Sequence, residues 1–582
     1  MDRADTSEEV EDRGPLSGRP WLTSYAPGVE ADIAVPAESL PEMLAASAER
    51  FGNRVALDFF GAETTYAELA DEVTRAAEAL RTVGVKPGDR VALVLPNCPQ
   101  HVVAFYAALR LGAVVVEHNP LYTAPELEHQ LADCGATVVV CWDKTAPVID
   151  ELRATTAVQV ILAVDLTSAL PWRMRLKLRL PVAKARAART SMTGPVPQGV
   201  LSWERVSSST GPLEAVHPQP VPGDVALLQY TGGTTGTPKG AILTHANLRA
   251  NAAQGRAWMP GLKDGEETVY GVLPLFHAYG LTLCLTFSMS VGATLVLLPR
   301  FDLDQMLEAI GRRPPTFLPA VPPIYERLAA AARERGVDLT SIRYAISGAM
   351  ALPPAVVELW ETVSGGLLVE GYGMTETSPI SLGNPAASTR RPGTVGVPFP
   401  STRIRIVDPD EPSNDQPIGV QGELLIGGPQ VFAGYWNRPG ETAQVLLHGG
   451  WLRTGDIAVA DSDGFVRIVD RIKELIITGG FNVYPSEVED VLREMPEIAD
   501  VAVVGVRSAD DTGEEVVAAV VPADGATVDP ERVRAFARER LTGYKVPRRV
   551  DIVNDLPRSQ IGKVLRRRVR DRIEATEAFE AD

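Results

Sequence analysis

The chain has 582 residues, a length that exceeds one ordinary hydrophobic core and favours about two to four domains. Its 45% hydrophobic and 22% charged residues are typical of a soluble globular protein, and its formal net charge of −18 argues against nucleic acid as a partner. Cysteines stand at positions 98, 134, 141 and 284 and form no CxxC pair. This disfavours a zinc or redox site and fits a reduced, cytoplasmic setting.

The first 30 residues are acidic and lack an apolar segment, so we expect a disordered tail and no signal peptide. From residue 39 to residue 141, amphipathic stretches alternate with short apolar runs such as 90–95. Thr65 and Glu68 form a capping-box pattern at the start of one such stretch. Helices that alternate with strands predict an α/β fold, in which helices cover both faces of a parallel sheet.

Residues 171–190 contain seven Arg and Lys residues and no acidic residue. Trp172, Met174 and Leu176 are among the apolar residues that alternate with them. One interpretation is a surface that contacts anionic lipid headgroups at the periphery of a membrane. The other is a solvated excursion whose charges pair with acidic residues elsewhere, and the sequence leaves this choice open.

Residues 230–240, YTGGTTGTPKG, follow an apolar run of strand length. Glycines let backbone N–H groups approach a ligand closely, threonines add hydroxyl donors, and Lys239 adds a positive charge, which together suit a polyphosphate. Pro238 and Gly240 flank this lysine, unlike the Gly-Lys-Ser/Thr ending of the P-loop. The stretch predicts a phosphate cradle of another lineage. Its candidate phosphate contacts are Thr231, Gly232, Gly233, Thr234, Thr235, Gly236, Thr237 and Lys239.

Residues 268–299 contain no Asp, Glu, Lys or Arg and could be mistaken for a membrane span. Pro274, Gly280 and Gly292 interrupt the run, so we expect a buried strand, a loop, a helix and a second strand. His277 lies in the loop PLFHAYG, directly after the first of these strands. We interpret this histidine as a site residue.

A second Gly-rich turn, GYGMTETSP at 371–379, also follows a predicted strand. Tyr372 can stack on a purine, Thr375 can bond a phosphate oxygen, and Glu376 can hold Mg²⁺. Upstream, the small residues Gly348 and Ala349 after another strand leave room for a flat ligand.

Residues 393–470 contain short strands and Gly turns and predict a β-rich subdomain. Asp456 lies at a tight turn there, where its carboxylate can accept both hydroxyls of a ribose. The remaining residues predict a small α+β domain that carries Lys563 near its end. We expect the basic residues just after this lysine, Arg566, Arg567 and Arg568, to be solvated.

The motifs at 119–136, 230–240, 274–280, 371–379, 451–482 and 556–566 resemble those of the adenylate-forming superfamily, closest to bacterial long-chain fatty acyl-CoA synthetases. The resemblance implies an αβ core over 31–392, a β-rich subdomain over 393–469 and a mobile C-terminal domain over 470–582, hinged at Asp470. It also implies an enzyme with two half-reactions. A fatty acid carboxylate attacks MgATP to give acyl-AMP and pyrophosphate, and the thiol of CoA then expels AMP.

The resemblance implies roles for individual residues. Lys563 would stabilise the adenylation transition state, Lys239 the departing pyrophosphate, and Glu376 the Mg²⁺ ion. The acyl pocket would include His277, Tyr279, Gly348 and Gly371. The nucleotide would contact Ala349, Glu370, Gly371, Tyr372, Gly373, Thr375, Asp456 and Arg471. After rotation at the hinge, CoA would meet Gly479, Gly480 and Phe481. Ile561 departs from the Ser or Thr that many relatives carry there.

The same residues bear on other possible functions. An amino-acid substrate is disfavoured because His277 stands where that branch carries an Asp. A fatty acyl-AMP ligase would carry an insertion near the hinge, which is not seen. An aryl-acid or short-chain CoA ligase stays open, as does the oligomeric state. A nucleotide-binding regulator on the same fold is disfavoured because Lys239, Glu376, Asp456 and Lys563 are all present.

Overall fold

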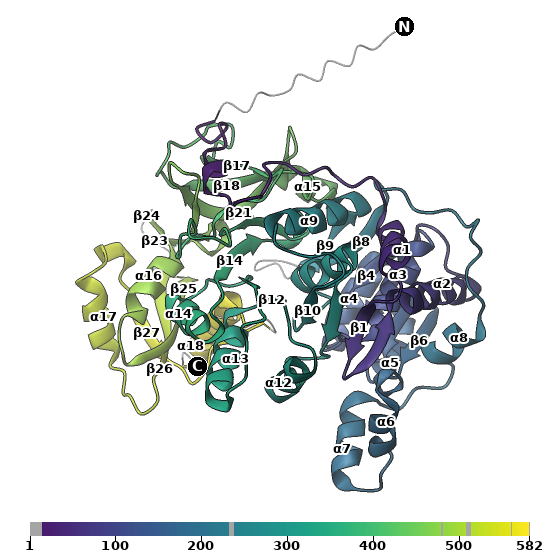
Figure 1. Cartoon of the computed structure of the whole chain (residues 1–582). Coiled ribbons are helices and arrows are strands. Elements are labelled where there is room, and N and C mark those ends of the chain that lie inside the picture. Colours follow the sequence, from purple (N-terminus) through teal and green to yellow (C-terminus); the bar gives the residue numbers. More distant parts are fainter. Residues whose placement is uncertain (1–13, 232–237, 479–480, 508–513, 560–561, 581–582) are drawn as a thin grey trace.

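The computed structural model describes residues 14–231, 238–478, 481–507, 514–559 and 562–580 (Figure 1). Two large sheets share one main hydrophobic core, and a β-rich sheet packs beside them. The C-terminal residues, coloured yellow-green in Figure 1, form a smaller α+β unit with a core of its own. The predicted α/β class, with a β-rich part and a small α+β C-terminal unit, is confirmed.

One large sheet is built mainly of short apolar strands. In spatial order its strands are β19 (Gly434–Tyr435), β9 (Lys239–Thr244), β8 (Val225–Thr231), β4 (Val114–Glu117), β3 (Arg90–Val94), β5 (Val138–Trp142), β6 (Val160–Val164) and β7 (Leu201–Ser202). The strands from β8 to β7 are parallel, whereas β9 pairs antiparallel with both β8 and β19. Near-continuous Val, Leu and Ile runs are expected where parallel strands are covered on both faces.

The second large sheet carries most of the loops that the sequence singles out. In spatial order its strands are β16 (Val397–Pro398), β15 (Ile380–Gly383), β14 (Leu368–Gly373), β13 (Tyr344–Ser347), β12 (Phe317–Ala320), β10 (Thr268–Gly271), β11 (Thr294–Leu297), β1 (Val55–Phe59) and β2 (Ala62–Thr65). The strands from β14 to β1 are parallel. The loops after β10, β13 and β14 therefore gather at one edge.

Helices cover these sheets. They are α1 (Leu40–Phe51), α2 (Tyr66–Thr82), α3 (Pro99–Arg110), α4 (Ala124–Cys134), α5 (Ala146–Glu151), η2 (Leu152–Ala154), η3 (Leu166–Ala169), α8 (Trp203–Ser209), α9 (His245–Trp258), α10 (Ala278–Gly280), η4 (Leu281–Thr286), α11 (Phe287–Val291), α12 (Leu303–Arg312), α13 (Pro322–Arg335) and α14 (Pro354–Ser364). The backbone N–H of Glu68 donates to Thr65 Oγ1 over 3.2 Å, and its carboxylate accepts from Thr65 N–H over 2.8 Å, which confirms the capping box.

Among the described helices, none is long and apolar enough to cross a membrane. Residues 268–299 instead form two strands joined by short buried helices, as predicted.

Residues 171–190 form most of a helical hairpin, made of α6 (Trp172–Leu178) and α7 (Ala183–Met192), that projects from the body (Figure 1). Its basic side chains are all exposed, and none forms an ion pair with the described part of the chain. They are Arg173, Arg175, Lys177, Arg179, Lys184, Arg186 and Arg189. The hairpin also exposes large apolar side chains: Trp172, Leu176, Leu180 and Val182 are 60%, 54%, 52% and 51% exposed.

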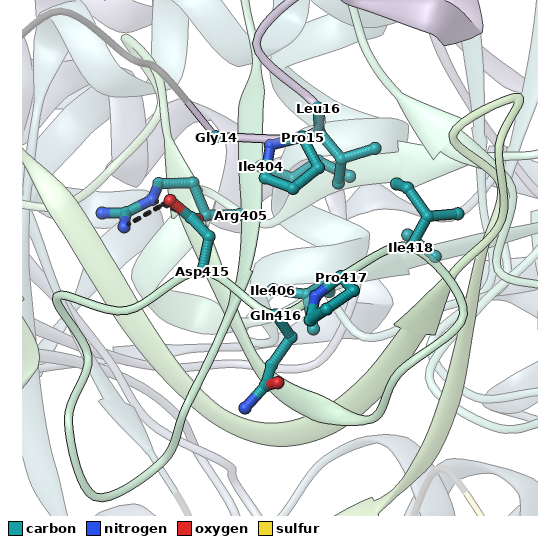
Figure 2. Close-up of a pocket in the computed structure, with 11 residues that line it drawn as sticks. Gly14, Pro15, Leu16, Ile404, Arg405, Ile406, Asp415, Gln416, Pro417 and Ile418 are labelled. Atoms are coloured by element: carbon teal, nitrogen blue, oxygen red, sulfur yellow. Dashed lines mark hydrogen bonds and ion pairs between the residues drawn. The ribbon is translucent and has the colours of Figure 1, made fainter.

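The β-rich sheet contains β17 (Arg403–Val407), β18 (Gly422–Gly427), β21 (Trp451–Ala460), β20 (Leu446–Leu447) and β22 (Val466–Arg471), and α15 (Pro439–Val445) precedes β20. Residues 14–33, here called the N-terminal strap, lie along it and include η1 (Pro20–Ser24). Figure 2 shows Leu16 of the strap beside Ile404 and Ile418.

The expectation of a disordered tail over residues 1–30 is wrong for residues 14–30. Leu16 and Trp21 are buried, and a Cβ added at Gly464 would lie 2.9 Å from the Trp21 ring. The acidic residues between positions 2 and 12 dominate the composition of the first 30 residues and concealed these apolar anchors. Residues 1–13 lie outside the described part of the chain.

The C-terminal unit contains η6 (Ile472–Glu474), β23 (Ile476–Thr478), β24 (Phe481–Val483), α16 (Pro485–Arg493), β25 (Ile498–Arg507), β26 (Glu514–Pro522), α17 (Pro530–Arg538), η7 (Gly543–Lys545), β27 (Arg549–Ile552) and α18 (Arg566–Glu580). Its sheet has the order β25-β26-β27, with an antiparallel first pair and a parallel second pair. Val488, Leu492, Val503 and Val533 are fully buried between this sheet and its helices. Helix α18 was not predicted.

Candidate active site

A cavity that is open to solvent lies where the end of α9 meets the loops after β10, β13 and β14. Ligands of open α/β sheets bind at the carboxyl ends of strands, so this edge is the expected place for a site. None of the described residues that line it is Asp, Glu, Lys or Arg. The structure places these predicted site residues on its wall: His277, Tyr279, Gly348, Ala349, Gly371, Tyr372, Gly373 and Thr375.

Two backbone features shape the wall beside β13 and β14. A Cβ added at Gly348 would lie 3.0 Å from the Tyr279 ring, so a larger residue there would displace this tyrosine. Tyr279 in turn is fixed because its hydroxyl donates to the carbonyl of Ile346 over 2.7 Å. Ala349 has a φ of 67°, an uncommon conformation for a residue other than glycine that is typical of functional sites.

His277 is a neutral hydrogen-bond donor toward the cavity that it lines. Burial lowers the pKa of its imidazole to about 4, so the ring carries no charge at neutral pH. Its Nδ1 accepts the backbone N–H of Tyr279 over 3.3 Å. The proton of the neutral ring therefore resides on Nε2, which can donate to a ligand oxygen.

Tyr372, Asp456 and Arg471 converge from three strands. Asp456 on β21 pairs with Arg471 on β22, and Arg471 Nε lies 3.0 Å from Asp456 Oδ1. The hydroxyl of Tyr372 donates to the other oxygen of the same buried carboxylate. Nearby on β14, burial raises the pKa of Glu370 to about 8, which keeps its carboxyl neutral at pH 7. A neutral carboxyl both donates and accepts hydrogen bonds, as an adenine edge requires.

Glu376 lies in η5 (Thr375–Thr377), directly after the cavity-lining Thr375. Its buried carboxylate accepts the hydroxyl of Tyr435 at Oε1 over 2.6 Å. The described residues contain no cluster of three or more metal-binding side chains. A single carboxylate still suits Mg²⁺, because this ion is commonly held by one or two carboxylates together with phosphates and water.

Lys239 begins β9 and pairs with Thr231 at the end of β8, so the two strands bring both ends of the predicted phosphate cradle together. Residues 232–237, and hence Gly232 to Thr237, lie outside the described part of the chain. Lys239 Nζ forms an ion pair with Glu441 of α15 and lies 4.8 Å from the Tyr435 ring centroid.

Sequence reasoning missed Tyr435 and Glu441. Tyr435 contacts both Glu376 and Lys239, and it is in place because β19 pairs with β9. No spacing rule predicts this long-range pairing. The only available signal was an aromatic pair, Tyr435-Trp436, between a glycine and a polar turn.

Lys563 faces the same region from the C-terminal unit. Burial, together with the positive charge of Arg471, lowers the pKa of Lys563 to about 8, while Glu474 and Asp456 oppose the shift. The preceding Gly562 has a φ of 83°, and a Cβ there would lie 3.5 Å from the sulfur of Met350. The loop that carries Lys563 therefore packs next to Met350, in the segment that follows β13.

Of the three predicted CoA contacts, the structure describes only Phe481. Gly479 and Gly480 lie outside the described residues, as does Ile561. Phe481 begins β24 and pairs through its backbone with Thr478.

The predicted hinge residue Asp470 is buried in an ionic cluster. Its carboxylate accepts the backbone N–H groups of Arg471 and Ser486, each over 2.8 Å. Arg566 lies 3.8 Å from Asp470, 2.7 Å from Glu489 and in an ion pair with Glu474. The expectation that Arg566 is solvated is therefore wrong, whereas Arg567 and Arg568 are exposed as expected. A run of arginines does not reveal which one faces a carboxylate cluster.

Comparison with known proteins agrees with this geometry. The profile of the AMP-binding enzyme family matches residues 44–436, and that of the AMP-binding enzyme C-terminal domain matches residues 487–563. A long-chain-fatty-acid–CoA ligase of Bacillus subtilis (strain 168) is 39% identical over 553 residues, covering 95% of this chain and 98% of that protein. A feruloyl-CoA synthase of Amycolatopsis sp is 37% identical over 514 residues, covering 88% and 94%.

The fold is also that of a solved nucleotide complex. The crystal structure of ATP-bound MatB from Rhodopseudomonas palustris superposes with a TM-score of 0.79 at 30% identity, covering 92% of this chain and 99% of that one. With this coverage and identity, the chain belongs to the AMP-binding enzyme family, the adenylate-forming group that its motifs resemble.

Proposed function

We propose that the protein is an ATP-dependent acid–CoA ligase that activates a long- or medium-chain fatty acid as acyl-AMP and then transfers the acyl group to CoA. One observation carries the choice of a fatty acid. The described lining of the cavity holds no charged side chain, and it includes Trp258, Met259, Leu283, Ile380 and Phe399. Such a wall favours an alkyl chain and offers no partner for the ammonium group of an amino acid. The name of the Bacillus subtilis relative supports the same substrate class.

In the first half-reaction, a carboxylate oxygen of the acid forms a bond to the α-phosphorus of ATP, and the bond to the pyrophosphate oxygen breaks. Pyrophosphate leaves with the electron pair. Nε2–H of neutral His277 would donate to the carboxylate, and the ammonium of Lys563 would bridge the carboxylate and the α-phosphate. Lys239 would stabilise the departing pyrophosphate. The protein supplies position and charge, so no enzyme nucleophile is needed.

The nucleotide would occupy the other end of the cavity. Tyr372 would stack on adenine, and Glu370 and Ala349 would lie at its edge. Asp456 and Arg471 would hold the ribose, which requires the Tyr372 hydroxyl to give up its bond to Asp456. Thr375 would contact the α-phosphate. Glu376 would hold Mg²⁺, which when bound would neutralise charge on the phosphates.

In the second half-reaction, the thiol of CoA loses its proton to solvent and its sulfur forms a bond to the acyl carbonyl carbon. The bond from this carbon to the AMP oxygen breaks, and AMP leaves with the electron pair. A rotation at Asp470 would withdraw Lys563 and bring Gly479, Gly480 and Phe481 to the path of the CoA chain. We also propose that the hinge lies at this residue because its buried carboxylate joins β22 to the start of α16.

An aryl acid is a second candidate substrate. The feruloyl-CoA synthase relative and the aromatic rings of Trp258 and Phe399 favour it. CoA-thioester formation with ATP, measured for acids from acetate to oleate and for benzoate and ferulate, separates the candidates. We expect the highest kcat/KM for acids of about 10 to 18 carbons. A preference for ferulate or acetate would overturn the fatty acid assignment.

We further propose that the enzyme is cytoplasmic and contacts membranes peripherally through the α6–α7 hairpin. The hairpin combines basic side chains that form no ion pair with any described residue with the exposed side chains of Trp172, Leu176, Leu180 and Val182. In a chain of net charge −18, this local positive surface is complementary to anionic lipid headgroups.

Co-sedimentation with liposomes tests the hairpin. We expect binding to vesicles that contain anionic lipid, weaker binding to neutral vesicles, and loss of binding at high salt. Arg173→Glu with Arg175→Glu and Lys177→Glu should abolish it. A control with Arg532→Glu, Arg538→Glu and Arg540→Glu on the C-terminal unit makes the same charge change elsewhere. Equal binding by both triple variants would contradict the assignment.

A further inference from the structure

Two stacked aromatic rings form part of the cavity wall. Trp258, the last residue of α9, and Phe399, which follows β16, both line the cavity. Their ring centroids are 4.4 Å apart, with an angle of 25° between the ring planes. Each side chain is only 2% exposed, so the stack is a wall with protein behind it.

The surroundings of this stack leave it little freedom. Nε1 of Trp258 donates to the carbonyl of Asn384 over 3.3 Å. On β15, a Cβ added at Gly383 would lie 2.6 Å from Phe399 and 3.5 Å from Trp258 Nε1. The two rings therefore lie directly against backbone and cannot retreat on that side to admit a longer ligand.

The N-terminal strap reaches the same wall from outside the cavity. Tyr25 does not line the cavity, but its ring meets Trp258 edge-on, with centroids 5.2 Å apart and planes at 84°. Its hydroxyl donates to the carbonyl of Pro398, the residue before Phe399, over 2.6 Å. Tyr25 therefore contacts Trp258 through its ring and the backbone next to Phe399 through its hydroxyl.

The strap is itself anchored on both sides of Tyr25. The hydroxyl of Thr389 donates to the carbonyl of Ser24 over 2.7 Å. The backbone N–H of Ile33 donates to Ser401 Oγ over 2.9 Å, and Arg19 forms an ion pair with Asp32 at 2.8 Å. Tyr25 is therefore held by a fixed segment whose order the composition of the tail had concealed.

We propose that the Trp258–Phe399 wall sets the longest acyl chain that the cavity accepts, and that Tyr25 is the positioning residue that keeps the wall closed. The inference rests on the proposed fatty acid ligase function and names its chain-length determinant. A terminal methyl group that reaches the rings has no room to move further. Each additional methylene buried in a longer pocket would increase the binding affinity of the acid about fourfold.

The test compares chain-length profiles, as kcat/KM for saturated acids of 6 to 20 carbons. Trp258→Ala should move the optimum to chains about two to four carbons longer, with the long-to-short ratio rising at least tenfold. Trp258→Leu, a smaller change in volume, should move it less in the same direction. Tyr25→Ala should also lengthen the optimum, and Tyr25→Phe, which keeps the ring, should largely restore the original profile.

Trp360→Ala is the matched control. Trp360 is fully buried in α14 and packs against Tyr325, away from the cavity lining. Its removal should lower stability and leave the profile unchanged. If Trp258→Ala and Trp258→Leu are both active and neither shifts the chain-length profile, the proposed role of the Trp258–Phe399 stack is wrong. The proposed ligase function would then still stand. Absence of any fatty acyl-CoA product from the wild-type enzyme would instead overturn the proposed function.

Discussion

Lys563 shows how one side chain can link the two domains chemically. It belongs to the C-terminal unit, yet its pKa responds to Arg471 and Asp456 of the β-rich sheet. Burial and the neighbouring arginine lower this pKa to about 8, so the lysine stays mostly charged at pH 7. In the first half-reaction we assign it a role that needs that charge.

The pH dependence of adenylation should report this lysine. Because its pKa in the folded enzyme lies below the usual value, the charge is present at pH 7 and is lost as the pH rises through about 8. We expect kcat/KM for acyl-AMP formation to fall about tenfold between pH 7 and pH 9. The measurement is pyrophosphate release at subsaturating ATP. Lys563→Arg, whose charge does not titrate in this range, should flatten the profile; an unchanged fall in that variant would exclude the lysine as its origin.

Glu441 gives the other residue-scale prediction. Its carboxylate pairs with Lys239, which the proposed mechanism places on pyrophosphate, so ATP must displace it. Glu441→Gln should lower KM for ATP up to about fivefold, the range of a partly exposed ion pair, with kcat little changed. Glu531→Gln on α17 removes a similar exposed pair with Arg534 and serves as control. A higher KM for ATP would mean that Glu441 itself helps to hold the nucleotide.

At the scale of elements, the junction between β22, α16 and α18 depends on one arginine. Arg566 of α18 faces Asp470, Glu474 and Glu489, all of which are buried or half-buried. A buried cluster of three carboxylates without a cation is strongly unfavourable, because each charge has lost its hydration. This arginine therefore fixes α18 and the predicted hinge to the rest of the C-terminal unit.

Arg566→Ala should destabilise this unit by about 3–5 kcal/mol. Hydrogen exchange of the β25 and β26 amides measures the free energy of its opening. Arg567→Ala, at the adjacent exposed position, should change that value by less than about 0.5 kcal/mol. Equal effects of the two substitutions would contradict the role assigned to the cluster.

At the scale of the whole molecule, local sequence patterns predicted those features of the fold and the site that depend on residues close together in the chain. Alternating helices and strands indicated the α/β sheets, and glycine-rich turns after strands indicated His277, Gly348 and Tyr372, which the fold brings to one cavity. The basic surface of the α6–α7 hairpin was visible as an isolated run of basic residues, but its two helices were not predicted.

Contacts between distant segments could not be predicted in this way. Tyr435 reaches Glu376 because β19 joins β9, and Tyr25 reaches Trp258 because the strap packs along the β-rich sheet. Neither depends on spacing along the chain. The strap was mistaken for a disordered tail because the acidic residues between positions 2 and 12 set the average of the first 30 residues and hid the apolar Leu16 and Trp21, which are buried.

In the proposed two-step reaction, Lys563 acts only in the first step. The most direct measurement separates the half-reactions of Lys563→Ala with palmitate. We expect palmitoyl-AMP formation from ATP to fall at least about 100-fold, because the bridging charge is lost. Conversion of supplied palmitoyl-AMP and CoA to palmitoyl-CoA should stay within about threefold of wild type. Equal loss in both halves, or no palmitoyl-AMP from the wild-type enzyme, would contradict the account.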